Sequence, residues 1–302
     1  DPKNDNNLEY CYNIPIDDNI MTCTLGLNKK IYCIPNNGQN IYIIDTTKEP
    51  DSTDFIRPIR LLEELRNNNK SYRTSILGPN GSIYCLPNGH NKLLIIDRYE
   101  DQIIVDIPIE YDQNKAIIYP KFQQCVLGKN GKIYSPYYSE NITELIVLEI
   151  DTKTDTTGLI KNKSLNTSYG NGPILSCVLG PNGNIYCPPY NISVDVDNRS
   201  DNLNKVVEVD IKTNKNNPTL NLVGDFIFDK SEDIRRVEKY KAQPILARNG
   251  NIYCAPFNIS NTLLIDIPKN KNNLGLILGL TLGIGLSLIA ITIYFIYRFR
   301  YK

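Results

Sequence analysis

Histidine, tryptophan, net charge and metal-binding spacings are scarce or absent in this 302-residue sequence. Lysine and arginine (33) balance aspartate and glutamate (33), so the chain carries no electrostatic footprint for nucleic acid. The single histidine, His90, lies in the loop segment Asn88-Gly-His-Asn91, where a solvated side chain is expected rather than a catalytic base. No Cys-x-x-Cys or His-x-x-x-His spacing indicates zinc, and no Gly-x-Ser-x-Gly motif indicates a serine hydrolase. We therefore predict no metal, no cofactor and no nucleic-acid partner.

Charge is also absent from residues 274–297, an apolar run long enough to span a bilayer as a helix. The short basic segment 298–302 that follows suits the cytosolic side of a membrane. The chain begins at Asp1 and its only methionine is Met21, which indicates that a secretory signal was removed. We therefore predict a single-pass membrane protein that contacts the lipid bilayer, with an extracellular or luminal N-terminal domain and a cytosolic C-terminus.

A short segment recurs five times along the rest of the chain, and its clearest copy is Cys177-Val-Leu-Gly-Pro-Asn-Gly-Asn-Ile-Tyr-Cys-Pro188. All copies share one tyrosine, and successive copies of it are separated by 52, 50, 52 and 67 residues. These tyrosines are Tyr32, Tyr84, Tyr134, Tyr186 and Tyr253. A period of about 50 residues is typical of repeat architectures, in which each unit buries its apolar face against its neighbours.

Each copy has the pattern of an antiparallel hairpin. Its turn, as in Gly78-Pro-Asn-Gly81, suits a three-residue loop in which proline presets one φ angle and glycine accepts the left-handed one. Two copies depart from this pattern. Lys29 replaces the second glycine in the first copy, and Ala247 replaces the leading glycine in the last.

An apolar run ending in aspartate follows each hairpin, and a further apolar run follows in most copies. Four short strands in about 50 residues is the content of one β-propeller blade. We therefore predict an all-β domain over residues 1–270, a five-bladed β-propeller of four-stranded antiparallel blades, with blade cores near 23–60, 74–109, 123–161, 175–226 and 243–266. The fifth copy lacks a fourth run, and we expect residues 8–16 to complete its sheet and close the ring.

Cysteines and sequons support a location outside the cytosol. A three-residue loop sets Cys23 opposite Cys33 and Cys177 opposite Cys187, about 4.5 Å apart at Cα, which is at the short end of disulfide geometry. The same register sets Ser75 opposite Cys85, so small buried thiols are the alternative to two disulfides. The candidate glycosylation sites are Asn69, Asn141, Asn162, Asn166, Asn191, Asn198 and Asn258, whereas the sequon at Asn80 lies inside a tight turn.

The pattern Gly-x-Asn-Gly-x-Ile-Tyr followed by Val/Ile-x-Ile-Asp resembles the blade signature of kelch-like propeller repeats over residues 23–266. The double glycine and the blade tryptophan of kelch repeats are missing. The Asn-, Ile- and Lys-rich chain as a whole looks like repeat proteins of the giant DNA viruses of amoebae. That resemblance implies a membrane glycoprotein of the virion or of the infected host cell.

Our leading functional hypothesis is an interaction or adhesion module that binds a protein or glycan partner through propeller loops, among which 137–145 and 191–205 are the most irregular. A structural membrane component without a small ligand is a further possibility. The catalytic alternative is a glycosidase, since five-bladed propellers include glycosidases that use paired carboxylates. Aspartates repeated in every copy are expected to cap strands or turns, at Asp45, Asp97, Asp151, Asp210 and Asp266. The carboxylates that break the repeat are Asp195, Asp197, Asp225, Asp229 and Asp233.

Overall fold

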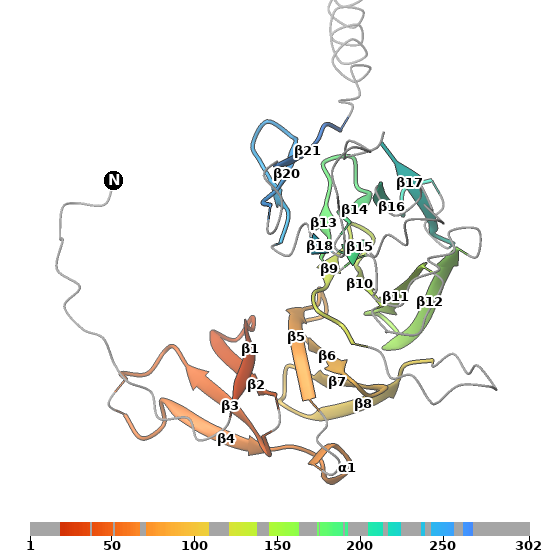
Figure 1. Cartoon of the computed structure of the whole chain (residues 1–302). Helices are drawn as coiled ribbons and strands as arrows, with labels where there is room; N and C mark the ends of the chain where they lie inside the picture. The colour runs from red at the N-terminus through yellow and green to blue at the C-terminus, as the bar shows by residue number, and fades with distance from the viewer. Residues whose placement is uncertain are drawn as a thin grey trace, which may run out of the picture. The chain divides into compact units, whose positions relative to one another are not determined.

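The structure is a computed structural model of the chain (Figure 1). It describes residues 19–36, 38–50, 52–66, 71–108, 121–137, 145–162, 174, 176–189, 191–192, 205–213, 217–224, 237–238, 243–256 and 262–267. The chain divides into two compact units, residues 1–265 and 266–302, and all strands of the described residues lie in the first. The predicted membrane span at 274–297 lies outside the described residues, among which no helix is both long and apolar enough to cross a bilayer.

Five antiparallel sheets follow one another along the first unit, one for each sequence repeat (Figure 1). The first contains β1 (Ile20–Leu25), β2 (Lys30–Pro35), β3 (Asn40–Asp45) and β4 (Ile56–Arg60). The second contains β5 (Ser71–Leu77), β6 (Ile83–Asn88), β7 (Lys92–Ile96) and β8 (Gln102–Asp106). The third contains β9 (Val126–Leu127), β10 (Lys132–Pro136), β11 (Leu145–Asp151) and β12 (Thr156–Asn162). The fourth contains β13 (Val178–Leu179), β14 (Ile185–Cys187), β16 (Val206–Asp210) and β17 (Thr219–Val223).

The fifth sheet has three strands in the described part of the chain, β19 (Ile245–Leu246), β20 (Ile252–Cys254) and β21 (Leu263–Ile265). The all-β class and the five repeated sheets are therefore confirmed, and four of these sheets have the predicted four strands. Residues 8–16, which we expect to complete the fifth sheet, lie outside the described residues. The remaining elements are a short helix, α1 (Glu63–Arg66), and a two-stranded pair, β15 (Asn191–Ile192) with β18 (Val237–Glu238).

The hairpin turns have the predicted three-residue geometry. In the second sheet the amide of Gly78 donates to the carbonyl of Ser82 at 2.8 Å, and the amide of Gly81 donates back to the carbonyl of Gly78 at 3.1 Å. Gly81 has a φ of 87°, the left-handed conformation that this loop needs at its last residue. In the first sheet Lys29 takes this conformation with a φ of 60°, although a side chain makes it less favourable.

Apolar clusters between neighbouring sheets form the core. Because side chains alternate along a strand, one face of the second sheet packs on the first sheet and its other face on the third, and the third sheet packs in the same way on the second and the fourth. Tyr32 and Ile43 of the first sheet, for example, share a core cluster with Ile83 and Leu94 of the second. Similar clusters join the second sheet to the third and the third to the fourth. In each pair, the face that bears the repeat tyrosine covers the next sheet.

The tyrosine face of the fifth sheet is exposed instead. Ile245 pairs with Tyr253, and Tyr253 pairs with Leu264, so these side chains form one row across the sheet. Their exposed fractions are 66%, 38% and 50%, whereas Tyr84 in the second sheet is fully buried. The last repeat therefore keeps the hairpin of the others without their covering layer.

Candidate functional site

The asparagine of each hairpin turn is bonded to the repeat tyrosine. In the second sheet, Asn80 Nδ2 donates to the hydroxyl of Tyr84 at 2.8 Å, while Asn80 Oδ1 accepts from the amide of Ser82 at 3.1 Å. Equivalent amide-to-hydroxyl bonds of 2.7 to 3.0 Å join Asn28 to Tyr32, Asn130 to Tyr134, Asn182 to Tyr186 and Asn249 to Tyr253. The side-chain nitrogen of the Asn80 sequon is therefore engaged in the fold.

The leading glycine of the turn leaves room for the tyrosine ring. A Cβ on Gly180 would lie 2.6 Å from Cε2 of Tyr186, which is closer than real Cβ atoms come to a neighbour. The fifth repeat has Ala247 at this position, and there the tyrosine, Tyr253, is 38% exposed. The buried tyrosine ring thus requires glycine at the leading position of the turn, because a Cβ there would clash with the ring.

Four of the five recurring aspartates cap turns, as predicted, whereas no turn bond is found for Asp266 in the described part of the chain. Asp45 accepts from both the amide and the hydroxyl of Thr47, and these bonds hold the pKa of Asp45 below its usual value. Asp97 accepts from the amides of Tyr99 and Asp101. Asp151 and Asp210 make the same kind of bond to the amides that follow them. These four carboxylates therefore hold their own loops.

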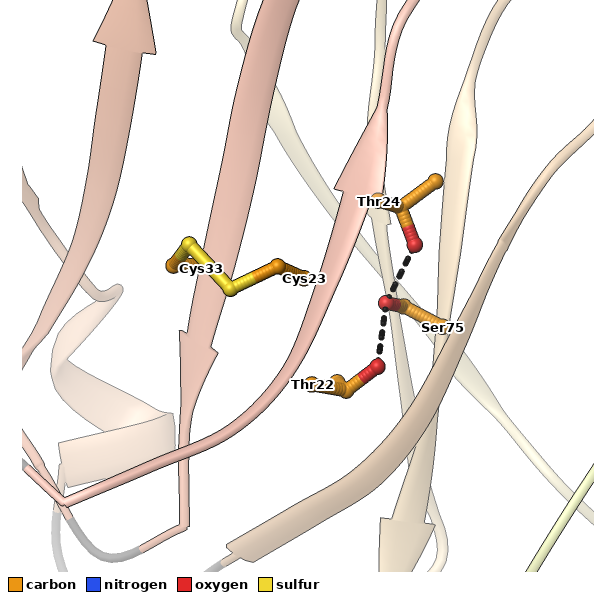
Figure 2. Close-up of a disulfide and its surroundings, with 5 residues drawn as sticks. All are labelled: Thr22, Cys23, Thr24, Cys33 and Ser75. Atoms are coloured by element: carbon orange, nitrogen blue, oxygen red, sulfur yellow. Dashed lines mark hydrogen bonds between the residues drawn. A yellow bond between two sulfur atoms is a disulfide. The ribbon is translucent and has the colours of Figure 1, made fainter. Parts of the chain in front are cut away.

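The two predicted disulfides are confirmed. Cys23 pairs with Cys33, and Cys177 pairs with Cys187, each with a Cα separation of 4.1 Å. Figure 2 shows the first of them beside Ser75 of β5, whose hydroxyl oxygen lies 3.0 Å from that of Thr22 and 2.6 Å from that of Thr24. These hydroxyl contacts join the first strand of one sheet to the first strand of the next.

Within the described residues, the cysteines Cys85, Cys125 and Cys254 are free and buried. Burial raises the pKa of Cys125 and of Cys254 to about 12. A thiol with so high a pKa is a poor nucleophile near neutral pH, because little thiolate is present. These cysteines pack as small apolar side chains.

The prediction of a solvated His90 is wrong. Its side chain is 5% exposed, its ring meets that of Tyr72 edge-on with centroids 5.1 Å apart, and Nδ1 accepts from the amide of Lys92 at 3.2 Å. The loop turns inward because the ring fills apolar space beside Tyr72 while its nitrogen satisfies a backbone donor. His90 is a packing residue.

A cavity of about 360 Å³ lies where the first and second sheets meet. Its walls come from the β1–β2 turn, the β5–β6 turn and the β7–β8 turn, and the lining residues are Gly26, Leu27, Asn28, Tyr32, Asn80, Gly81, Ile83, Asp97, Arg98 and Tyr99. Tyr99 and Leu27 are 70% and 72% exposed. Aromatic, apolar, amide and guanidinium groups thus surround one open space, as in pockets that hold small polar ligands.

The matching place between the second and third sheets is filled by protein. There the β11–β12 turn contacts the hairpin turn of the preceding sheet: the Tyr84 hydroxyl donates to Asp155 Oδ1 at 2.5 Å, and Asn80 Nδ2 donates to the Thr152 carbonyl at 3.0 Å. Burial is the largest cause that raises the pKa of Tyr84, and the bond to Asp155 adds to it. The β7–β8 turn, residues 98–100, is one residue shorter than the β11–β12 turn, residues 152–155.

Charged groups hold the cavity wall in place. The Arg98 guanidinium carbon lies 4.7 Å from the centroid of the Tyr99 ring. Glu100, the next residue, is paired with Lys30 at 2.9 Å and with Arg57, both from the first sheet. The turn that carries Arg98 and Tyr99 is therefore anchored across the junction while these two side chains are left exposed.

No protein-family model matches the sequence, and no curated protein matches it. Several solved structures nevertheless share its architecture. A catalytically inactive variant of virginiamycin B lyase from Staphylococcus aureus, solved with quinupristin, has a TM-score of 0.52 and 14% identity over 86% of this chain and 74% of its own. This chain has a β-propeller fold.

A second neighbour of this propeller is the extracellular domain of a proposed one-component system from B. thetaiotaomicron. It has a TM-score of 0.54 and 11% identity over 86% of this chain and 29% of its own. At such identities the likeness shows the fold alone. Because one of the two is an enzyme and the other is an extracellular domain, the propeller fold does not decide between catalysis and binding.

Several residues predicted for the propeller's function lie outside the described residues. These are the carboxylates Asp195, Asp197, Asp225, Asp229 and Asp233, and the sequons at Asn69, Asn141, Asn166, Asn198 and Asn258. Asn191 lies in β15. Asn162 Nδ2 donates to the carbonyl of Leu220 in the next sheet at 2.7 Å. In the part of the chain that the structure describes, no group of three or more His, Cys, Asp or Glu side chains is placed to hold a metal ion.

Sequence reasoning missed the cavity of the propeller. We expected the binding surface in the long irregular insertions at 137–145 and 191–205, and that prediction is untested because most of both insertions lies outside the described residues. The cavity arises from short, regular turns, and its signal in the sequence was the length of residues 98–100 compared with the next repeat. That difference has a meaning only once the two turns are known to meet the preceding sheet.

Proposed function

We propose that this propeller is a non-catalytic binding module that recognises a glycan or protein partner through the cavity between its first and second sheets. The observation that carries the proposal is the contrast between two equivalent junctions, one filled by Asp155 and Thr152 and the other open. The five turn asparagines and repeat tyrosines, and four of the five repeated aspartates, are bonded within the fold, which supports binding by the open junction rather than chemistry by the repeats.

The proposed setting is a membrane surface. Residues 274–297 would anchor the chain, and the propeller would face the extracellular or luminal side, where disulfides persist. The two disulfides and the predicted sequons support this orientation. The resemblance to kelch-like repeats and to repeat proteins of giant amoebal viruses supports a virion or host-cell membrane. Protease treatment of intact membranes tests the topology: cleavage of the propeller from the cytosolic side alone would contradict it.

Binding and catalysis are separated by one pair of experiments on the full chain in detergent micelles. A glycan array and a set of immobilised cell-surface proteins measure binding, and a panel of chromogenic glycosides measures hydrolysis. Saturable binding without turnover is expected. Turnover would favour the alternative, a carbohydrate-active enzyme that uses the aspartates outside the described residues. The absence of both binding and turnover would contradict the proposed function.

A further inference from the structure

The hydroxyl group of Tyr32 differs from those of its counterparts in the next three sheets. The hydroxyls of Tyr84, Tyr134 and Tyr186 each accept a bond from the turn asparagine and donate to a carboxylate, at 2.5, 3.0 and 2.8 Å. The hydroxyl of Tyr32 accepts from Asn28 in the same way. Within the described residues, however, it has no carboxylate acceptor. Its proton is therefore available in the cavity that Tyr32 lines.

A hydroxyl proton that no protein group accepts can be donated to a ligand, so the cavity favours a ligand that supplies an acceptor. In the following junction the acceptor of the tyrosine proton is a carboxylate on a neighbouring turn, Asp155. In this cavity Arg98, which has a guanidinium group, is among the lining residues. Asp97 also lines the cavity, but its Oδ1 accepts two amides of its own turn, and within the described residues no bond joins its carboxylate to the Tyr32 hydroxyl.

The remaining wall suits a sugar ring. Tyr99 is 70% exposed and offers an aromatic surface, and Asn28, whose Nδ2 donates to the Tyr32 hydroxyl, is also among the lining residues. The volume of about 360 Å³ is at the small end for ligand pockets, which favours one ring rather than an extended chain. A planar guanidinium group and a tyrosine hydroxyl that line one cavity can together bind a carboxylate through charge-assisted hydrogen bonds.

We propose that the cavity between the first and second sheets binds a sugar that carries a carboxylate, with Tyr32 and Arg98 bonded to the carboxylate and Tyr99 against the ring. This inference rests on the proposed binding function and narrows it to one ligand class and one place. The ligand carboxylate takes the position that Asp155 occupies in the next junction. In the first junction the ligand thus supplies the carboxylate that the protein supplies in the second.

The test uses two sugars that differ only at the sixth carbon, methyl β-glucuronide and methyl β-glucoside. Saturation-transfer NMR titrations of both sugars, with the full chain in detergent micelles, measure their relative affinities. Stronger binding of the glucuronide by at least tenfold is expected, because a charge-assisted hydrogen bond is typically worth a factor of ten or more. Equal binding of the two sugars would overturn the proposal.

Two variants and a matched control locate the site. Tyr32→Phe removes one hydroxyl and keeps the buried ring, and Arg98→Ala changes an exposed residue, so both are expected to fold and to lose about tenfold in affinity for the glucuronide. The control is Lys153→Ala, an exposed residue of the equivalent turn in the closed junction, which is expected to bind like the parent chain. Undiminished glucuronide binding by both cavity variants would overturn the assignment.

The outcomes also separate this inference from the proposed function. Binding of other glycans or of proteins that both cavity variants retain would leave a binding module without this site. A glutamate-rich peptide that binds and is lost in Tyr32→Phe, with no response to the glucuronide, would overturn the sugar as ligand. If the parent chain binds no ligand in any assay, both the proposed binding function and this inference are contradicted.

Discussion

The first and fourth sheets contain the same cross-hairpin disulfide in different surroundings. Cys177 and Cys187 are 2% and 0% exposed and belong to the apolar cluster that the fourth sheet shares with the third. In the first sheet Cys33 is buried but Cys23 is exposed, and Cys33 clusters with residues of its own sheet, such as Tyr42 and Ile44. The repeat determines which atoms bond, and the neighbouring sheet determines whether that bond is covered.

Removal of the disulfides should produce the largest difference between the two sheets. Either pair closes a loop with a sequence separation of 10, so replacing both of its cysteines by alanine is expected to cost about 3 kcal/mol through chain entropy. The Cys177→Ala/Cys187→Ala variant should lose about 1 kcal/mol more, because it leaves a cavity in a packed core. Urea unfolding of both variants measures this. A larger loss for Cys23→Ala/Cys33→Ala would contradict the comparison.

Alanine at the leading glycine should have the next largest effect. Gly180→Ala brings a methyl group to 2.6 Å from the buried Tyr186 ring and is expected to cost about 2–3 kcal/mol. Gly26→Ala meets first the side-chain oxygen of Asn28, at 2.8 Å, and then the Tyr32 ring at 3.0 Å, so about 1–2 kcal/mol is expected. Thermal denaturation ranks the two variants. Equal melting temperatures would show that the two tyrosines tolerate the methyl group equally.

The tyrosine hydroxyls provide a smaller contrast. Tyr186→Phe removes a bond to the carboxylate of Glu208 as well as the one from Asn182, and about 1.5 kcal/mol of stability should be lost. Tyr32→Phe removes only the bond from Asn28, and about 0.5 kcal/mol is expected. The free energies of unfolding from urea titrations check both values. If Tyr32→Phe is the more harmful, its hydroxyl has a structural role that the open cavity does not indicate.

The last residue of the turn should respond in opposite directions. Lys29→Gly removes the strain of a side chain at a φ of 60° and is expected to stabilise the protein by up to about 1 kcal/mol. The greater conformational entropy that glycine gives the unfolded chain reduces this gain. Gly183→Lys introduces a side chain where φ is 96° and should destabilise by about 1 kcal/mol. Differential scanning calorimetry distinguishes the two signs. Destabilisation by Lys29→Gly would mean that the lysine side chain makes a compensating contact.

The smallest effect is expected from the aspartates that end β3 and β16. Hydrogen bonds from Thr47 lower the pKa of Asp45. For Asp210 desolvation acts upward, but the bonds from Thr213 and Lys212 outweigh it, so its pKa is also lowered. A lowered pKa stabilises the fold above the unfolded value of about 4 and loses that contribution as pH falls through the folded value. In Thr47→Val, carboxyl NMR titration should show a higher pKa for Asp45 and an unchanged one for Asp210.

Much of the fold could be predicted because its pattern is local. The turn Gly180-Pro-Asn-Gly183 specifies a three-residue loop, the loop sets the register, and the register places Cys177 opposite Cys187. The turn-capping aspartates were predictable for the same reason, since each bonds amides two to four residues away. The prediction that His90 is solvated was wrong because the burial of His90 depends on Tyr72, which lies in another strand and is not specified by the loop of His90.

The candidate site could not be predicted, because it depends on how a turn meets a hairpin from the preceding repeat. Tyr32 and Tyr84 stand in nearly identical sequences, yet one hydroxyl meets Asp155 and the other lines a cavity. Nothing near either tyrosine in the sequence differs enough to show this. The difference lies in residues 98–100 and 152–155, about 70 residues further along the chain.

By itself the sequence determined the hairpin, its register, its disulfide partners and the number of repeated sheets, because these follow from turn chemistry and from a period that neighbouring residues carry. Only the tertiary structure decided which faces are covered, which tyrosine proton is left for a ligand and which disulfide meets solvent. Those properties depend on contacts between repeats about 50 or more residues apart, where a change of one residue in a turn opens or fills a junction.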